Sequence, residues 1–291
     1  MSGSHARGLE EELSVPIREN SCPEELDDDS ATSACRGSPL PADAEPAWLP
    51  PPADLRLTDD EVHLWRATLD QPGRYVRQLA QTLSDDERAR AERYHFQRDC
   101  RRFIVARGIL RAILGCYLGL EPGQVQLGYN THGKPYLLEG FGCDTLQFNL
   151  SHSQGLALYA FTCGRRIGVD VEYVYHVPEA DEIAIQFFSP RESAVWQALP
   201  PEQRGEALFN CWTRKEAYLK ALGDGLAQPL DRFEVSLLPG EPARLLGVAG
   251  DPEAAACWSL ASLTPTLGYV AALAVEGGGW RLRCWGWRPA P

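Results

Sequence analysis

The stretch Arg166-Ile167-Gly168-Val169-Asp170-Val171-Glu172 alternates apolar and polar side chains, which predicts a β-strand. Because successive side chains of a strand point to opposite faces, Ile167, Val169 and Val171 would pack inward. Asp170 and Glu172 would then share the other face, about 7 Å apart along the backbone. Two carboxylates this close repel each other unless a positive charge lies between them, and a hard cation such as Mg²⁺ prefers oxygen ligands. The stretch therefore predicts either a metal site or a strand face whose acids are solvated.

A second pattern lies in Phe209–Lys220, where the spacing of apolar residues predicts a helix. Trp212 and Leu219 would pack this helix against the sheet, so that Glu216 would lie at the edge of the core beside the two strand acids. The alternative is that Glu216 only pairs with Lys220 one helical turn later, an interaction worth roughly 0.2–0.5 kcal/mol.

Two turns carry groups that could bind phosphate. Residues 146–161 predict a β-hairpin with the polar connection Ser151-His152-Ser153, whose hydroxyl and imidazole groups could donate to a phosphate or could be solvated. The turn His132-Gly133-Lys134-Pro135 exposes a lysine that could bind phosphate or belong to an ordinary surface turn. The sequence contains no Gly-x-x-x-x-Gly-Lys-Ser/Thr loop, no Gly-x-Gly-x-x-Gly and no Gly-x-Ser-x-Gly, which disfavours the common nucleotide loops and serine-hydrolase chemistry.

The two parts of the sequence repeat one order of elements: strand, capping box, long helix, strand. The first set is a strand near Val62, a capping box at 84–87, a helix over 99–118 and a strand over 125–129. The second set is a strand over 167–171, a capping box at 189–192, a helix over 207–222 and a strand over 233–237, with later strands over 267–275 and 280–287. We therefore predict an α/β (α+β) fold built as a pseudo-twofold pair of similar αβ subdomains, with the active site between them.

Charge and composition divide the chain unevenly. The net charge is −12 over 291 residues, but residues 1–55 hold 12 acidic residues against three arginines, a net of −9 that leaves −3 for the rest. Residues 88–111 hold eight arginines against Glu92 and Asp99, which suits a phosphorylated ligand or an acidic protein partner. We expect 1–55 to be a disordered or loosely attached leader, 56–164 to form the N-terminal half and 165–291 the C-terminal half.

Cysteine usage and hydropathy indicate the compartment. The nine cysteines are odd in number and include no Cys-x-x-Cys pair, so a reducing cytoplasm is the simpler interpretation. The sequence has no apolar run of the length that a membrane span needs and no secretory signal. It also lacks the interleaved aromatic pattern of a nucleic-acid module, so we expect neither a membrane nor a nucleic acid as a partner.

The order of the motifs is more specific than any one of them. Gly-Lys-Pro at 133, Phe-Asn-Leu-Ser-His-Ser at 148, Gly-Val-Asp-Val-Glu at 168, Phe-Phe-Ser-x-x-Glu at 187 and Trp-x-x-Lys-Glu-Ala-x-x-Lys-x-x-Gly at 212 follow one another. This series resembles the 4'-phosphopantetheinyl transferase superfamily, and most of all its surfactin-synthetase-activating type, in which both halves lie in one chain. The resemblance covers roughly residues 60–240.

The resemblance implies a reaction. It implies that the phosphopantetheine arm of coenzyme A is moved to a serine hydroxyl of an acyl or peptidyl carrier protein, with release of 3',5'-ADP. It implies Mg²⁺ as the metal, with Mn²⁺ as an alternative, and coenzyme A as co-substrate. The carrier could belong to fatty acid, polyketide or nonribosomal peptide synthesis, and two-half members of the family are usually monomers.

The resemblance also implies roles for particular residues. The metal ligands would be Asp170, Glu172 and Glu216. Glu216 would also be the general base, and Lys220 would neutralise or protonate the departing 3',5'-ADP. The groups implied to contact coenzyme A are Arg93, Arg98, Gly133, Lys134, Pro135, Asn149, Ser151, His152, Asp170 and Lys215, with Arg107 and Arg111 as further candidates. Arg111 could equally pair with a carboxylate inside the fold.

Two rival functions remain open on the sequence. One is a magnesium-dependent phosphoesterase that would cleave coenzyme A-like nucleotides with water in place of the carrier serine. The other is a non-catalytic module that binds carrier proteins through a decayed site, against which every expected acidic and basic position is filled.

Overall fold

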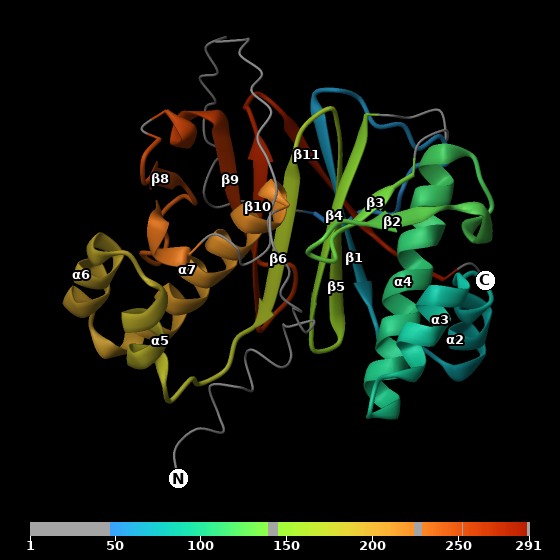
Figure 1. Ribbon diagram of the computed structural model, residues 1–291, viewed down its shortest axis with the longest axis horizontal. Coiled ribbons are helices and arrows are strands. Elements are labelled where there is room, and N and C mark those ends of the chain that lie inside the picture. The colour runs from blue at the N-terminus through green and yellow to red at the C-terminus, as the bar shows by residue number, and fades with distance from the viewer. Residues whose placement is uncertain (1–46, 139–144, 224–228, 252, 290–291) are drawn as a thin grey trace.

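Two αβ halves lie side by side in the computed structural model, which describes residues 47–138, 145–223, 229–251 and 253–289 (Figure 1). They meet where the strand β4 (Leu146–Ser153) of the N-terminal half runs beside β6 (Ile167–Tyr173) of the C-terminal half. No helix in the described part of the chain is long and apolar enough to cross a membrane.

The N-terminal half is a four-stranded sheet in the order β11-β1-β5-β4. Its other strands are β1 (Glu61–Thr68), β5 (Leu156–Cys163) and β11 (Arg281–Gly286). One face carries α2 (Gly73–Ala80), α3 (Asp85–Glu92) and the long α4 (Gln97–Leu118). The short 3₁₀ turn η1 (Pro122–Gln124) leads into a two-stranded ribbon of β2 (Leu127–Tyr129) and β3 (Pro135–Leu137).

The C-terminal half repeats this plan with a three-stranded sheet in the order β6-β10-β9. Its strands are β9 (Trp258–Leu263) and β10 (Tyr269–Glu276), and its helices are α5 (Ala180–Phe187), α6 (Pro190–Ala198) and α7 (Pro201–Leu222). A ribbon of β7 (Phe233–Val235) and β8 (Leu245–Val248) lies between the 3₁₀ turns η3 (Leu230–Arg232) and η4 (Ala254–Cys257). The repeated order confirms the predicted pseudo-twofold fold.

Three apolar layers form the core of the molecule. One layer lies between α4 and the first sheet, and a second lies between α7 and the second sheet. The third lies between the two sheets and includes Leu64, Leu158, Val169, Val171 and Leu273, all fully buried. The inward packing predicted for Ile167, Val169 and Val171 is confirmed, and it makes one continuous molecule of the two halves.

Gly168 allows α7 to lie directly on β6. A Cβ atom at this position would be 2.0 Å from the carbonyl oxygen of Ala217 and 2.4 Å from the nitrogen of Ala221, both in the helix backbone. Backbone atoms cannot move aside as the tip of a flexible side chain can, so glycine is the residue that fits. The contact brings the C-terminal turns of α7 against the strand that carries Asp170 and Glu172.

Several element boundaries differ from the sequence-based ones. α7 begins at Pro201 rather than near Ala207, because Pro201 takes the first helical position, where its missing N–H costs nothing. The segment Ser151–Ser153, predicted as the connection of a hairpin, continues β4, and the turn falls at Gln154, where φ is 50°. Both long helices end at a left-handed glycine as expected, Gly119 and Gly223.

The two ends of the described chain meet on the first sheet. β11 pairs in parallel with β1, so the last strand lies in the sheet of the N-terminal half. Leu49 forms a bridge with Trp285, and the guanidinium of Arg66 lies 4.8 Å from the ring centre of Trp48. The expectation that 1–55 is loosely attached is therefore wrong for Trp48 and Leu49. Leu49 pairs with the last strand and Trp48 packs on Arg66, and the composition of a segment does not predict such contacts of single residues. Residues 1–46 lie outside the described residues.

Replacing Gly168 by alanine should unfold or strongly destabilise the protein. The added methyl group would overlap the backbone of α7, and overpacking of a well-packed core costs about 1–3 kcal/mol even where side chains can move. Gly205→Ala in the same helix is the matched control, because its Cβ would meet nothing within 4 Å. We expect that control to raise stability by roughly 1 kcal/mol through helix propensity. Urea unfolding followed by circular dichroism measures both; equal midpoints for the two variants would contradict the close contact.

Candidate active site

Side chains of β4 join the two halves at their junction. β4 and β6 belong to different sheets, and three polar side chains of β4, two residues apart in turn, reach β6. Asn149 Oδ1 accepts from the backbone N–H of Val169 at 2.8 Å. Ser151 Oγ donates to Asp170 Oδ1 at 2.9 Å, and Ser153 Oγ donates to Glu172 Oε2 at 2.8 Å. Each bond fixes one position of the strand that carries the acids.

Asp170 is the most buried acid of the junction, with 1% of its surface exposed. Its Oδ1 accepts from Lys220 Nζ at 2.6 Å in addition to Ser151. Its Oδ2 is buried and, among the described residues, has no hydrogen-bond partner. Burial alone would lower the pKa of Lys220, but the carboxylates of Asp170 and Glu216 outweigh it and raise that pKa. An unpartnered buried carboxylate oxygen is costly unless a further ligand completes it.

Glu172 and Glu216 show that this region carries too much negative charge for its burial. Burial raises the pKa of Glu172 to about 8, and the charge of Asp170 acts in the same direction. Burial also raises the pKa of Glu216 to about 7, although Lys220 opposes this shift. Both carboxyl groups would be stabilised as anions by an added positive charge.

The donor set fits a hard divalent cation. It offers three carboxylates that interact electrostatically and one oxygen without a partner. As they stand, however, no three Asp, Glu, His or Cys side chains of the described chain form a group compact enough to hold a metal ion. The ligand shell expected from Asp170, Glu172 and Glu216 is therefore not preformed, since Lys220 occupies one oxygen of Asp170, and the metal site stays a prediction.

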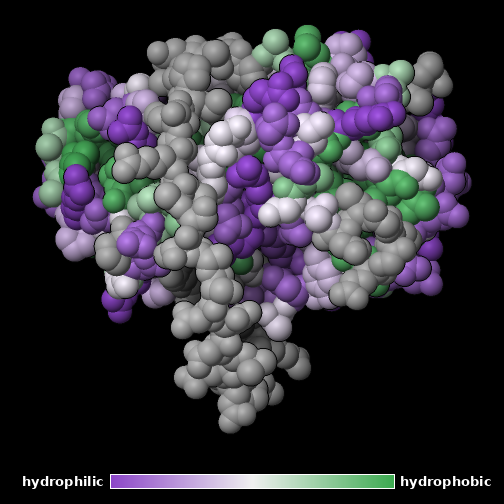
Figure 2. Space-filling model, turned by 90° about the horizontal axis from the view of Figure 1, so that it is seen from above, coloured by the Kyte–Doolittle hydropathy of each residue, from purple (hydrophilic) through white to green (hydrophobic). Residues whose placement is uncertain are grey.

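Positive groups surround the imidazole of His152 on the α4 side of β4. Desolvation of the ring, together with the charges of Lys220, Arg107, Arg102 and Arg90, lowers the pKa of His152 to about 4, although part of the residue is exposed to solvent. Such surroundings disfavour another cation and favour an anion. Figure 2 views the molecule from above, toward the end where β4 begins, and shows hydrophilic residues over the middle of that face between more apolar flanks.

Arg107 is the buried member of this cationic group. It is 6% exposed, and its Nη1 is buried with no partner in the part of the chain that the structure describes. Its guanidinium lies 5.6 Å from the ring centres of Phe103 and Tyr129 and 3.7 Å from Glu87. The guanidinium of Arg90 lies 5.5 Å from the ring centre of the same Phe103. Aromatic rings thus hold both guanidinium groups in place.

The two arginines expected to contact coenzyme A lie on the surface of the N-terminal half, and that role stays a prediction. Arg93 and Arg98 are exposed, and Arg98 forms a 3.4 Å pair with its neighbour Asp99. The charges that act on His152 come instead from Arg90, Arg102 and Arg107. Neither Arg90 nor Arg102 was among the residues expected at the site. Helical spacing does not group Arg102 with Arg107, because residues five positions apart point about 140° away from each other around a helix.

Lys215, expected to contact coenzyme A, has its ammonium inside the fold of the C-terminal half. It is 1% exposed, and its ammonium pairs with Glu192 at 2.7 Å and donates to the carbonyls of Leu230 and Phe233, both at 2.6 Å. An ammonium has three donors, and all three are used inside the fold. The motif placed Lys215 beside Glu216, but on a helix neighbouring residues point about 100° apart.

Arg111 has the corresponding place in the N-terminal half. It pairs with Glu87 at 2.6 Å and donates to the carbonyl of Val125 at 2.7 Å, so the pairing inside the fold that the sequence left open is confirmed. Glu87 and Glu192 are both the third helical residue of a capping box. Arg111 and Lys215 both precede the terminal glycine of their helix by eight residues. The two halves therefore use the same buried pair for the same structural purpose.

The Gly-Lys-Pro turn reaches into the C-terminal half. Lys134 Nζ donates to the carbonyl of Lys220 at 2.5 Å, at the end of α7. Gly133 has the positive φ of 78° that the turn requires, and Pro135 is buried at the start of β3. A nucleotide-binding role for the three residues stays a prediction, and the lysine already has a place in the fold.

Comparisons with known proteins agree with this arrangement. Residues 64–163 match the family described as 4'-phosphopantetheinyl transferase, N-terminal, and residues 166–274 match the 4'-phosphopantetheinyl transferase superfamily. The two matches meet between β5 and β6. The 4'-phosphopantetheinyl transferase HetI of Nostoc sp. is 50% identical over 82% of this chain and 97% of its own. The 4'-phosphopantetheinyl transferase Sfp of Bacillus subtilis is 28% identical over 53% of this chain and 66% of its own.

A solved structure titled "Chronobacterium ammoiniagenes apo-ACPS structure" covers 39% of this chain and 97% of its own at 22% identity, with a TM-score of 0.30. That likeness is too slight to support an argument. The identity and coverage of the Nostoc relative, together with both family matches, define an enzyme of the transferase class. The chain belongs to the 4'-phosphopantetheinyl transferase superfamily.

Breaking the buried pair of Lys215 should cost stability and leave coenzyme A recognition unchanged. Lys215→Met would leave Glu192 charged and unpaired in the core, a loss of about 3–5 kcal/mol. The exposed pair of Arg191 and Glu234 gives the matched control, since Arg191→Met should cost less than about 1 kcal/mol. Denaturant unfolding and the KM for coenzyme A measure the two effects. A raised KM with unchanged stability would restore the ligand role of Lys215.

The imidazole of His152 should titrate near pH 4 in the free protein. Because the pKa is depressed, the ring is neutral at pH 7, and it gains a proton only when the pH falls toward 4. Binding of 3',5'-ADP should raise this pKa, since phosphate charges offset the nearby arginines, and Lys220→Met should raise it as well. NMR titration of the ring measures it; a value near 6.5 that neither change moves would contradict the cationic site.

Proposed function

We propose that this enzyme transfers phosphopantetheine from coenzyme A to a carrier-protein serine with the help of Mg²⁺ held by Asp170, Glu172 and Glu216. The observation that carries the proposal is that the two carboxylate oxygens of Asp170 have different surroundings. One of its oxygens accepts from Lys220 and Ser151, while the other is buried and unpartnered among the described residues. When bound, Mg²⁺ would supply charge neutralisation at the diphosphate. Mn²⁺ offers the same octahedral oxygen coordination as an alternative.

The protein's own residues would position and deprotonate the reacting groups. Glu216 titrates near neutrality, which suits a general base that takes the proton of the carrier serine, directly or through water. Lys220 is held charged beside Asp170, so it would neutralise the departing 3',5'-ADP. Transfer at phosphorus depends on such positioning and neutralisation more than on covalent help from the enzyme.

The nucleotide end of coenzyme A would lie against the cationic group on the other side of β4. His152, Arg107 and Arg90 present imidazole and guanidinium donors there, and Nη1 of Arg107 is unpartnered within the described residues. Guanidinium groups bind phosphate in a bidentate manner. The assignment replaces the Arg93 and Arg98 of the motif-based prediction by Arg90 and Arg107.

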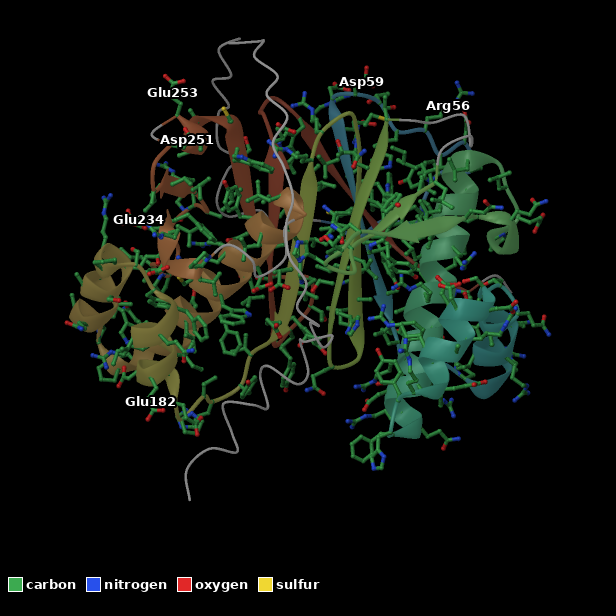
Figure 3. All side chains as sticks on the ribbon, in the orientation of Figure 1. Arg56, Asp59, Glu182, Glu234, Asp251 and Glu253 are labelled. Atoms are coloured by element: carbon green, nitrogen blue, oxygen red, sulfur yellow. The ribbon has the colours of Figure 1, made fainter. Side chains whose placement is uncertain are left out.

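The protein partner would be an acyl or peptidyl carrier domain. The exposed arginines of 88–102 give one edge of the site a positive surface, which complements an acidic partner and would speed its association. Acidic side chains of the C-terminal half such as Glu182, Glu234, Asp251 and Glu253 lie at its outer edge instead (Figure 3). A cytoplasmic, monomeric enzyme with no nucleic-acid partner completes the proposal.

Mass spectrometry of an apo carrier domain mixed with coenzyme A, Mg²⁺ and this protein should show a mass gain equal to the phosphopantetheine arm. EDTA should abolish the gain, and added Mg²⁺ or Mn²⁺ should restore it. Asp170→Asn and Glu216→Gln should each lower kcat by roughly 100-fold or more, since each removes charge where positioning matters most. Glu182→Gln, at the outer edge, is the control and should leave the rate unchanged.

The phosphoesterase alternative makes the opposite prediction. With coenzyme A and no carrier, a phosphoesterase would release 3',5'-ADP rapidly, whereas a transferase should release little. Release at a rate independent of the carrier would overturn the proposed function.

A further inference from the structure

The turn between β2 and β3 crosses from the N-terminal half to the last turn of α7. Asn130 Nδ2 donates to the carbonyl of Gly223 at 2.8 Å. Lys134 Nζ donates to the carbonyl of Lys220 at 2.5 Å, with longer contacts to the carbonyls of Ala221 at 3.5 Å and Ile167 at 3.4 Å. The donors therefore reach three carbonyls at the end of α7 and the first residue of β6.

These carbonyls are the ones that a helix cannot satisfy by itself. The last four C=O groups of an α-helix lack partners within the helix, and they carry the negative end of its dipole. A lysine ammonium at that end stabilises the terminal turn both as a donor and as a charge. Gly223 is left-handed, with a φ of 85°, so the chain leaves the helix where Asn130 holds it.

The turn itself is built to present both donors. Asn130 Oδ1 accepts from the backbone N–H groups of His132 and Lys134, at 3.0 and 2.8 Å. The same side chain thus closes the turn with its oxygen and binds the helix end with its nitrogen. Gly133 supplies the positive φ that lets Lys134 turn toward α7.

Lys220 depends on this end of the helix. It lies in the last turn of α7, its backbone carbonyl accepts from Lys134, and its ammonium lies 2.6 Å from Asp170. Glu216 lies one turn earlier and is further from the terminus, where helices fray. A frayed last turn would therefore displace Lys220 more than Glu216.

We propose that Asn130 and Lys134 are positioning residues, which hold the last turn of α7 so that the ammonium of Lys220 stays against Asp170, rather than residues that bind coenzyme A. The inference rests on the proposed function, in which Lys220 neutralises the leaving group. In this role, Lys134 would affect the rate of the transfer step and not the affinity for the nucleotide.

A positioning role and a coenzyme A-binding role predict changes in different kinetic constants, kcat for the first and KM for the second. Lys134→Met and Asn130→Asp should both lower kcat by about 10- to 100-fold, because misplacement of a catalytic group by about 1 Å has that effect. The KM for coenzyme A should change less than about twofold. Asn130→Asp keeps the oxygen that closes the turn and replaces the donor to Gly223 by a negatively charged oxygen, which would repel the carbonyls at the helix end. Lys134→Arg, which keeps the charge and the donors, should recover much of the loss, and exposed His132→Ala in the same turn is the control.

A double variant tests whether the effect passes through Lys220. In a Lys220→Met background, adding Lys134→Met should lower kcat by no more than about twofold further, since the group it positions is gone. A lysine that binds coenzyme A directly would cost its full factor again. A raised KM with unchanged kcat, or wild-type kinetics in Asn130→Asp, would overturn the inference.

Hydrogen exchange separates this inference from the proposed function. The amides of 219–223 should exchange faster in Lys134→Met and Asn130→Asp than in the wild-type protein, while those of 207–214 should not change. This result needs neither carrier nor coenzyme A. If the wild-type protein fails to modify a carrier, the proposed function fails, and exchange then decides the positioning role. Unchanged exchange at 219–223 would overturn that role whatever the activity.

Discussion

The contact between Gly168 and the backbone of α7 sets the distance between the acids of β6 and the side chains of Glu216 and Lys220. Because no side chain stands between strand and helix, Lys220 can reach Asp170, and Glu216 enters the electrostatic field of both strand acids. The polar side chains of β4 then fix the same strand from its other edge. α7 packs against β6 on one side, and side chains of β4 form hydrogen bonds to it on the other. The position of this strand therefore fixes where its carboxylates lie.

The charges of the junction suit a cation and an anion bound next to each other. Burial, together with the charge of Asp170, raises the pKa values of Glu172 and Glu216. Desolvation, together with the nearby cations, lowers the pKa of His152. A divalent cation would offset the negative charge around Asp170, and a phosphorylated nucleotide would offset the positive charge around His152. Both ligands are needed to offset both charges.

The pseudo-twofold plan is symmetric in structure and asymmetric in chemistry. Both halves bury a capping-box glutamate against a cation of the long helix, Glu87 with Arg111 and Glu192 with Lys215. Counted from the terminal glycines, however, Glu216 and Lys220 correspond to Ala112 and Cys116. The fold therefore repeats its stabilising pair and builds the reactive pair once.

The sequence by itself determined the repeated order of strands and helices, the helix ends at Gly119 and Gly223, and the acids on one face of β6, because these follow from local periodicity, caps and glycine conformation. Only the tertiary structure decided what each polar side chain faces. Lys215 and Lys220 lie five residues apart on one helix, yet the first is buried against Glu192 and the second lies at the site. Arg90, Arg102 and Arg107 meet His152 only because α3, α4 and β4 pack together, and the turn at 130–134 meets α7 across ninety residues of chain. Such contacts depend on how elements distant in sequence approach each other, which no local pattern records.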